Sequence, residues 1–304
     1  MKTPGRTPVL ILTLVLLTAS AHNSPAQSRT SIGPEAPQRQ AENRSGDGMA
    51  AIPGGTFEIG IDGADVPRLK SLFHTDAMQL FEPEILRHEV TIASFYLDKY
   101  PVTNAQFKKF TEANPEWRPD RIAANLHNGN YLKHWNEPDA LARKSNHPVV
   151  NVSWYAAVAY CRWTGKRLPT EAEWERAARG GLTALYPWGD QPVEKSRANY
   201  SGSGIGATTP VGTYPANGYG LYDMAGNVWE FVADEWQSYP ATPQKNPVAG
   251  GNLFTDGTAF LEVKTRRAIR GGSWGGDPIN LWVEYRDSHP PNGAQDFAGF
   301  RCAK

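Results

Sequence analysis

The sequence predicts a loop-rich α+β domain with few long helices or strands, on the basis of three observations. The 304 residues include 10 Trp, 12 Tyr and 11 Phe, whose large rings supply buried surface. They also include 29 Gly and 24 Pro, which end secondary-structure elements after a few residues. Helix-start patterns occur at only a few positions, and no internal repeat is visible.

The first 21 residues have the pattern of a secretory signal peptide. Two basic residues precede an apolar run at positions 9–17, and small residues at 19–21 form a cleavage site, with an alternative cut after residue 26. The apolar run is too short to cross a bilayer comfortably, so we expect no membrane span once the signal is removed. No cysteine follows the run, which argues against a lipid anchor.

Residues 27–48 are rich in Ser, Pro, Gln, Arg and Gly, and predict a flexible linker because they cannot bury enough apolar surface to offset the entropy of ordering. The folded domain should then occupy residues 49–304, in the periplasm or outside the cell. The whole chain carries 31 Lys and Arg against 31 Asp and Glu. This balance gives no indication of nucleic acid or an anionic membrane as a partner.

Three helices are predicted from their start and stop patterns. Capping boxes, in which a Thr is followed three residues later by Gln or Glu, predict helices that begin after Thr103 and Thr170. The second of these should end near residues 180–181. Another helix begins after Ser153, where apolar residues recur on one face until Gly165 stops it.

Strands are predicted at residues 88–92, 95–99 and 267–270, and the segment 186–205 has turn residues but little periodicity. A long irregular segment inside a compact domain needs a metal, a disulfide or dense aromatic packing to hold it. The chain has two cysteines, Cys161 and Cys302. In an oxidising compartment an even pair indicates a disulfide, and two separate buried thiols are the alternative.

Seven short segments stand out between residue 49 and the C-terminus. The longest is GKRLPTEAEWE at residues 165–175. The others are IPGGTF (52–57), YPVTN (100–104), PVVNVSW (148–154), GYGLYDMAGNVWE (218–230), RGGSW (270–274) and GFRC (299–302). In this order they resemble the formylglycine-generating, or sulfatase-modifying-factor, family. The resemblance implies a loop-rich α+β fold related to C-type lectins, with bound calcium and a disulfide between Cys161 and Cys302.

The resemblance also implies a calcium site in the segment from Asp223 to Glu230. Its ligands would be the side chains of those two residues and the carbonyls of Gly226 and Val228. Carboxylates mixed with backbone carbonyls suit a hard cation. The alternative is an ordinary turn in which Glu230 is solvated and Trp229 belongs to the core.

A second, weaker calcium site would fall on Asn199, Ser203 and the carbonyls of Tyr200 and Ile205. Here the sequence departs from the family, because Ser203 stands where an acidic ligand is expected. Losing that charge weakens a site for a hard cation. We therefore expect this second site to be empty or weak.

Enzymes of the family oxidise a substrate cysteine through copper held by two cysteine thiolates, just beyond the Gly-Gly-Ser segment. Soft thiolates suit Cu(I), and carboxylates or amides do not replace them well. Residues 274–301 contain no cysteine, and the remaining two lie outside that segment. We therefore expect neither copper nor the family's sulfatase-activating oxidation.

A pocket near the Gly-Gly-Ser segment remains the best candidate for a ligand site. Aromatic walls with a few polar groups suit an organic ligand or an extended peptide. The alternative is that the tryptophans are core residues and Arg286 forms a structural ion pair. The seven histidines have no close ligand spacing, which favours surface or hydrogen-bonded roles. The candidate pocket residues are Trp229, Ser273, Trp274, Trp282, Glu284, Arg286 and His289.

Three functions are compatible with these patterns. The first is an exported enzyme of the family's copper-free branch, which includes a periplasmic pyoverdine-maturation protein; it would carry out oxidative tailoring of a peptide or siderophore-like substrate. The second is a calcium-stabilised, lectin-like binding module. The third is a subunit of an envelope complex without catalysis.

Overall fold

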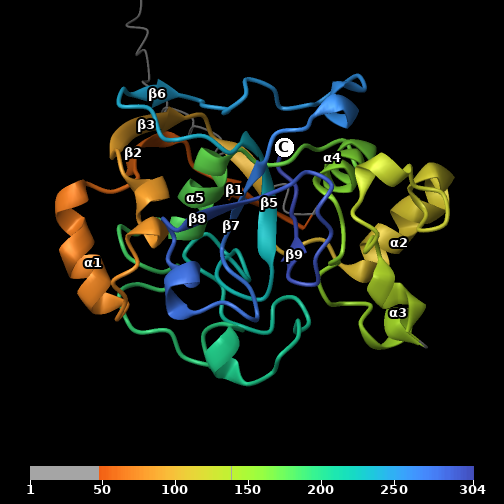
Figure 1. Cartoon of the computed structure of the whole chain (residues 1–304), viewed down its shortest axis with the longest axis horizontal. Helices are drawn as coiled ribbons and strands as arrows, with labels where there is room; N and C mark the ends of the chain where they lie inside the picture. Colours follow the sequence, from red (N-terminus) through yellow and green to blue (C-terminus); the bar gives the residue numbers. More distant parts are fainter. Residues whose placement is uncertain (1–47, 138) are drawn as a thin grey trace, which may run out of the picture. The chain divides into compact units, whose positions relative to one another are not determined.

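The computed structural model describes residues 48–137 and 139–304 (Figure 1). The predicted signal peptide and almost all of the predicted linker lie outside the described residues. The helices are α1 (Val66–Leu72), α2 (Asn104–Ala113), α3 (Ala140–Arg143), α4 (Trp154–Trp163) and α5 (Glu171–Arg179). The strands are β1 (Met49–Ile52), β2 (Gly55–Ile59), β3 (His88–Ile92), β4 (Phe95–Asp98), β5 (Trp229–Glu235), β6 (Gln244–Lys245), β7 (Arg267–Arg270), β8 (Arg286–His289) and β9 (Ala298–Gly299).

Short sheets and long connections make up the domain, so the predicted loop-rich α+β class is confirmed. The largest sheet has the order β8-β7-β5-β9, with β5 antiparallel to β7 and parallel to β9. Two smaller sheets pair β1 with β4, and β2 with β3 and β6. Figure 1 shows β5 near the centre of the view, with α5 on one side of it and α2, α3 and α4 on the other. No helix within the described ranges has the length and hydropathy needed to cross a membrane.

The three predicted helices are confirmed, and each begins at the predicted cap. Thr103 and Thr170 both close complete capping boxes, in which the side chain and backbone of each partner satisfy one another. The Ser153 hydroxyl accepts the N–H of Ala156 at the start of α4. Helix α5 ends at Gly180, which adopts the left-handed conformation that glycine tolerates best.

The predicted strands at residues 88–92 and 267–270 are confirmed, and the third ends one residue early, at Asp98. The central strand β5 was not predicted. Six of its seven residues are buried, because it has neighbours on both faces, so its sequence shows no alternation of apolar and polar residues. Burial on both faces removed the period-two pattern on which the prediction of strands depends.

The expected disulfide between Cys161 and Cys302 is present, with the two Cα atoms 5.6 Å apart. It joins α4 to the C-terminal segment, and both cysteines are fully buried. That segment is also held by backbone hydrogen bonds, since Ala303 exchanges two with Arg167 and Lys304 exchanges two with Tyr96. The C-terminus is therefore an integral part of the fold.

A buried ion network lies between α5 and the β7–β8 pair. Glu171 accepts hydrogen bonds from Arg270 at 2.9 Å and from Arg286 at 2.8 and 2.6 Å. Glu175 binds Arg270 through one oxygen and Arg179 through the other. Several charges removed from water are tolerated because each guanidinium faces a carboxylate. The segment TEAEWE thus supplies the anionic side of this network, and RGGSW supplies part of its cationic side.

Burial raises the pKa of two further carboxyl groups beside this network, Glu84 and Asp234. Burial raises the pKa of Glu84 to about 8, against the lowering effect of the Arg286 N–H that it accepts. Burial also raises the pKa of Asp234 to about 7, and the neighbouring charge of Glu171 adds to the effect. In both, low polarity around the group disfavours the ionised form.

Replacing Glu84 by Gln should flatten the pH dependence of stability. The folded protein holds a proton on Glu84 up to about pH 8, whereas the unfolded chain releases it near pH 4.5, so this group makes stability fall as pH rises through that range. Glutamine is nearly isosteric and cannot ionise. In urea titrations, the loss of unfolding free energy between pH 5 and pH 8 should be about 2–4 kcal/mol smaller in Glu84→Gln.

The matched control for that experiment is Glu112→Gln, which removes an exposed carboxylate on α2. Its pH dependence should equal that of the wild type. Equal slopes for wild type and Glu84→Gln would show that Glu84 is already ionised in the folded protein.

Candidate functional site

The structure does not bring the seven predicted pocket residues around one cavity. Trp229, Ser273 and Trp282 are buried, and Trp282 packs against Phe73 of the α1 region. His289 is half-buried between two phenylalanine rings. Trp274 lines a hollow of its own, described below.

Glu284 and Arg286 belong to the buried ion network, and each lines a different cavity: Arg286 one of about 300 Å³ and Glu284 one of about 470 Å³. Glu284 accepts a hydrogen bond from Arg179 at 2.7 Å, and Arg286 is bonded in fork geometry to Glu171. The alternative of a structural ion pair for Arg286 therefore holds. Ser273 follows β7 and leads into a turn and a short 3-10 helix (Pro278–Leu281), so the strand–turn–helix context of a nucleophilic serine is absent here.

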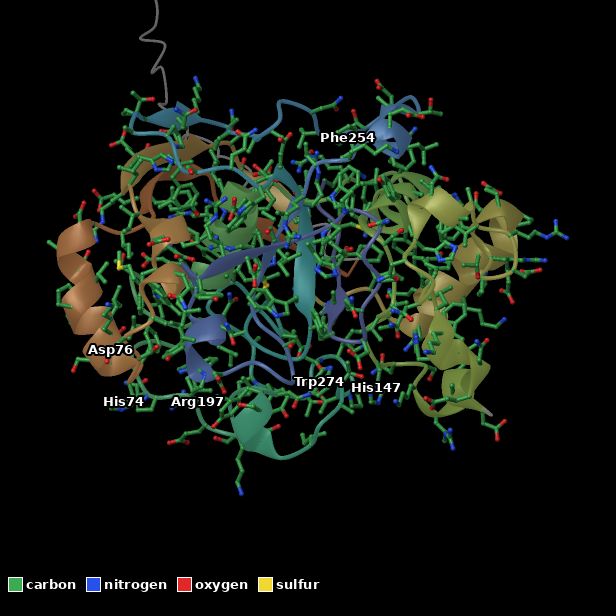
Figure 2. All side chains as sticks on the ribbon, in the orientation of Figure 1. His74, Asp76, His147, Arg197, Phe254 and Trp274 are labelled. Atoms are coloured by element: carbon green, nitrogen blue, oxygen red, sulfur yellow. A yellow bond between two sulfur atoms is a disulfide. The ribbon has the colours of Figure 1, made fainter. Side chains whose placement is uncertain are left out.

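A polar hollow opens on the side of the molecule that carries Trp274, and we call it the His134 hollow. Two adjoining cavities of about 140 and 570 Å³ share His134, Glu137 and Asp296 in their walls. Trp274 lines the smaller cavity, and Asn151 lines the larger. Figure 2 shows Trp274 and His147 at the same edge of the domain. Thr208 lines the smaller cavity together with Trp274, and its hydroxyl oxygen lies 3.0 Å from Nδ1 of His147.

Asn104 fixes the orientation of His134. The Asn104 side-chain amide donates to the carbonyls of Lys144, His147 and Pro148, so its other atom must be the oxygen. That oxygen lies 3.0 Å from His134 Nε2, and it also accepts the indole N–H of Trp135 at 2.8 Å. Since Asn104 Oδ1 can only accept, His134 must carry its hydrogen on Nε2.

His134 Nδ1 therefore keeps a lone pair; it is buried and has no partner at ordinary hydrogen-bond geometry among the described residues, but the Asn151 side chain lies beside the ring and partly offsets the effect of burial on the His134 pKa. Burial lowers the pKa of His134 to about 4, and the charge of Lys144 lowers it further. The imidazole is thus neutral at physiological pH. An unpaired acceptor inside a polar hollow is a site for an N–H or O–H group of a ligand.

The rim of the His134 hollow carries both signs of charge. Glu137 and Asp296 are exposed acids, and the Lys144 ammonium is half-buried between His134 and His147. Trp274 is tied to this rim because its indole N–H donates to the Asp296 carbonyl at 3.1 Å. The hollow therefore combines an aromatic wall, a fixed neutral acceptor and mixed charges, as sites for organic ligands commonly do.

The residues expected to bind calcium at Asp223–Glu230 fit a cation at one end of the segment. Asp223 is buried; one carboxylate oxygen accepts the Gly212 N–H at 2.8 Å, and the other has no partner among the described residues. A buried carboxylate oxygen without a donor fits a cation. At the other end, Glu230 is already paired with Arg301 by two bonds of 2.7 Å.

The second expected calcium site is closed by a hydroxyl group. Ser203 lies 2.9 Å from the Asn199 side-chain oxygen and 2.7 Å from the Tyr200 carbonyl, so its hydroxyl bridges the two oxygens that the family offers to a cation. The Asn199 amide is bound to the Ala207 carbonyl. Ile205 is exposed. The Ser203 hydroxyl thus forms, within the loop, the hydrogen bonds of the oxygens that would otherwise bind a cation.

Comparison with known proteins gives a family match over most of the chain. The model of the sulfatase-modifying factor enzyme 1-like domain matches residues 34–304. The chain belongs to the sulfatase-modifying factor enzyme 1-like family. The resemblance found in the seven sequence segments is therefore confirmed.

Members of the family with known names are similar over most of this chain. The formylglycine-generating enzyme of Thermomonospora curvata is 34% identical over 87% of this chain and 96% of its own, and that of Mus musculus is 32% identical over 84% and 74%. The solved structure of PvdO from Pseudomonas aeruginosa superposes with a TM-score of 0.61 and 27% identity, over 84% of this chain and 93% of that one. Treponema denticola variable protein 1, at 22% identity and a TM-score of 0.61, shows the fold alone.

The side chains of this family member do not fit the copper site of formylglycine-generating enzymes. Copper there needs two free thiolates, and in this chain Cys161 and Cys302 are bonded to each other. Gly275 and Gly276, which follow Ser273 and Trp274, offer no side-chain ligand.

The sequence patterns did not single out His134, because its orientation depends on a hydrogen bond to Asn104, 30 residues earlier in the chain. The YPVTN segment could have indicated this contact, because Asn104 is buried at the first position of a helix and its side chain needs hydrogen-bond partners outside that helical turn.

Proposed function

We propose that this chain is an exported, copper-independent maturation enzyme that binds a peptide or siderophore-like substrate in the His134 hollow. The observation that carries the proposal is the unpaired Nδ1 of His134, held in place by Asn104. An N–H or O–H group of the substrate would donate a hydrogen bond to this atom, which would fix the position of that group. The aromatic wall of Trp274 supports the same location.

The tailoring step would be an oxidation of an electron-rich ring, such as the catechol-like rings of siderophores. Such a ring transfers electrons to dioxygen readily once a hydroxyl group is deprotonated. The substrate loses two electrons and two protons, and dioxygen takes up both to give hydrogen peroxide. His134 would accept a hydrogen bond from the ring hydroxyl group and orient it, and Lys144 beside it would favour the phenolate, whose proton ends on the hydrogen peroxide.

The test uses a synthetic peptide that contains dihydroxyphenylalanine, with the tyrosine analogue as a blank. Oxygen consumption and peroxide should rise above the uncatalysed rate with wild-type mature protein. His134→Ala should return the rate to near the uncatalysed level, since losing the group that positions a reacting atom costs about 10²-fold. His127→Ala, in a neighbouring loop where the ring accepts the Gly129 N–H, is the matched control and should keep the activity.

Activity that survives His134→Ala would refute the role of this residue. Binding of the peptide without oxygen consumption would favour the alternative function, a binding module without catalysis. The low pKa of His134 favours a binding module, because a weakly basic imidazole still accepts a hydrogen bond from a ligand.

We also propose that calcium stabilises the 223–230 segment through Asp223 and the carbonyls of Gly226 and Val228. Calcium should raise the melting temperature of the wild type relative to chelator, whereas Asp223→Asn should abolish that difference. Glu230→Gln should instead lower the melting temperature in both conditions, because it breaks the pair with Arg301. Identical melting curves of the wild type in calcium and in chelator would remove calcium from this proposal.

A further inference from the structure

A second polar hollow, which we call the tyrosine cleft, has a volume of about 620 Å³. It lies at the start of α2 and extends to Tyr222, and it shares no lining residue with the His134 hollow. Its size is within the range of small-molecule sites. Neither the family's copper chemistry nor the proposed function uses it.

Two tyrosine rings form an aromatic platform in this cleft. Tyr100 and Tyr222 are stacked, with ring centroids 4.7 Å apart and planes inclined by 19°. Tyr100 keeps 37% of its surface exposed, so the platform is open to a ligand. A large exposed aromatic surface has a cost in water unless something covers it.

The platform is held in place by the buried Arg301. Its guanidinium donates to the carbonyls of Asp98 and Lys99 on one segment and to the carbonyl of Tyr222 on the other. The Tyr222 N–H also donates to the Lys99 carbonyl at 2.9 Å. These hydrogen bonds hold the segments that carry Tyr100 and Tyr222 side by side, in addition to the stacking of the rings.

Tyr160 directs an unpaired hydroxyl group towards the cleft. Its ring is in the core, stacked on Phe107 at 5.6 Å, and the residue is only 6% exposed. The residue nevertheless lines the cleft, and no described residue forms a hydrogen bond with its hydroxyl. Burial and the nearby charge of Asp98 raise the pKa of Tyr160, so the group stays protonated and can donate.

The polar part of the remaining lining carries no net charge, and Pro101, Val102 and Val211 add apolar surface. Lys166 and Asp98 are its charged side chains, and they neutralise each other at 2.5 Å. The side-chain amide of Asn146 and the NH₂ group of Gln106 have no bonding partner among the described residues. The cleft therefore offers several free donors and acceptors around an aromatic platform.

We propose that the tyrosine cleft binds a neutral oligosaccharide. The C–H groups on the face of a sugar ring are attracted by the negative face of an aromatic ring. Sugar hydroxyl groups both donate and accept, so they match the phenol of Tyr160 and the amides of Gln106 and Asn146. A phosphate or other anion would lack an unpaired cation, and an apolar ligand would leave those polar groups without partners.

The proposal is tested by calorimetric titration of the mature protein with cellotetraose, maltotetraose and chitotetraose, and with galacturonate tetramer as the anionic comparison. At least one neutral sugar should bind with a dissociation constant in the micromolar to millimolar range. Tyr160→Phe removes a single hydroxyl and keeps the ring, so it should weaken binding about 2–10-fold without changing the melting temperature. Tyr100→Ala should weaken binding by at least about tenfold.

Tyr96→Ala is the matched control, because Tyr96 is similarly exposed, at 44%, on β4 but lies outside the cleft. It should leave affinity unchanged. The proposal is overturned if no neutral sugar binds at about 10 mM, or if the anionic tetramer binds alone. It is equally overturned if binding is unaffected by both Tyr160→Phe and Tyr100→Ala, since the sugar would then lie elsewhere.

Discussion

Glu171→Ala should cost about 3–5 kcal/mol of unfolding free energy, the largest loss expected from a single substitution in this protein. The substitution removes the carboxylate that faces both Arg270 and Arg286. Arg286 would then be buried without its carboxylate partner, and Arg270 would keep only Glu175, which is far more costly than losing an exposed pair. The melting temperature should fall by roughly 6–20 °C.

The control is Glu112→Ala, which breaks a pair with Lys108 on the exposed surface of α2. Such pairs contribute at most about 0.5 kcal/mol, so its melting temperature should hardly change. Glu171→Gln should fall between the two, because an amide can still accept hydrogen bonds but carries no charge. Equal effects of Glu171→Ala and Glu112→Ala would mean that water reaches the network and screens it.

Local features of this fold could be predicted because they depend on residues close together in the chain. The capping boxes at Thr103 and Thr170 each span four residues, and the stop of α5 depends on one glycine. The strand at residues 267–270 was predicted from the adjacent Gly271–Gly272 pair, which marks its end. In each case the energy that selects the structure is present in a short window of sequence.

The site could not be predicted in the same way because its contacts join distant segments. Glu171 and Arg286 are 115 residues apart, and no spacing rule links them. The sequence therefore left two roles open for Arg286, a ligand pocket or a structural ion pair. Similarly, it predicted surface or hydrogen-bonded roles for the histidines but did not indicate that Asn104 is the partner of His134.

The family resemblance predicted more than local patterns could, but it did not predict replacements. It gave the disulfide partners correctly, since Cys161 and Cys302 are bonded. It did not foresee that the Ser203 hydroxyl would bridge the oxygens of Asn199 and Tyr200. A resemblance indicates where a ligand stood in relatives, whereas only geometry shows what stands there in this chain.

Removing the disulfide by the double substitution of Cys161 and Cys302 with Ala should destabilise the domain by about 2–4 kcal/mol. The bond closes a loop with a sequence separation of 141 residues, so it removes many conformations from the unfolded chain. It also anchors the segment in which Arg301 binds Glu230. Urea unfolding of the oxidised wild type and the double variant should show this as a lower midpoint.

Burial of both sulfurs gives a second, kinetic expectation. Because neither cysteine is exposed, dithiothreitol should leave the folded protein oxidised and should reduce it only as fast as the domain opens. Alkylation and peptide mapping measured against urea concentration would then follow the unfolding curve. Free thiols in the native protein, or reduction at a rate independent of urea, would show that the bond does not hold the C-terminal segment, and that hydrogen bonds such as those of Arg301 and Ala303 hold it instead.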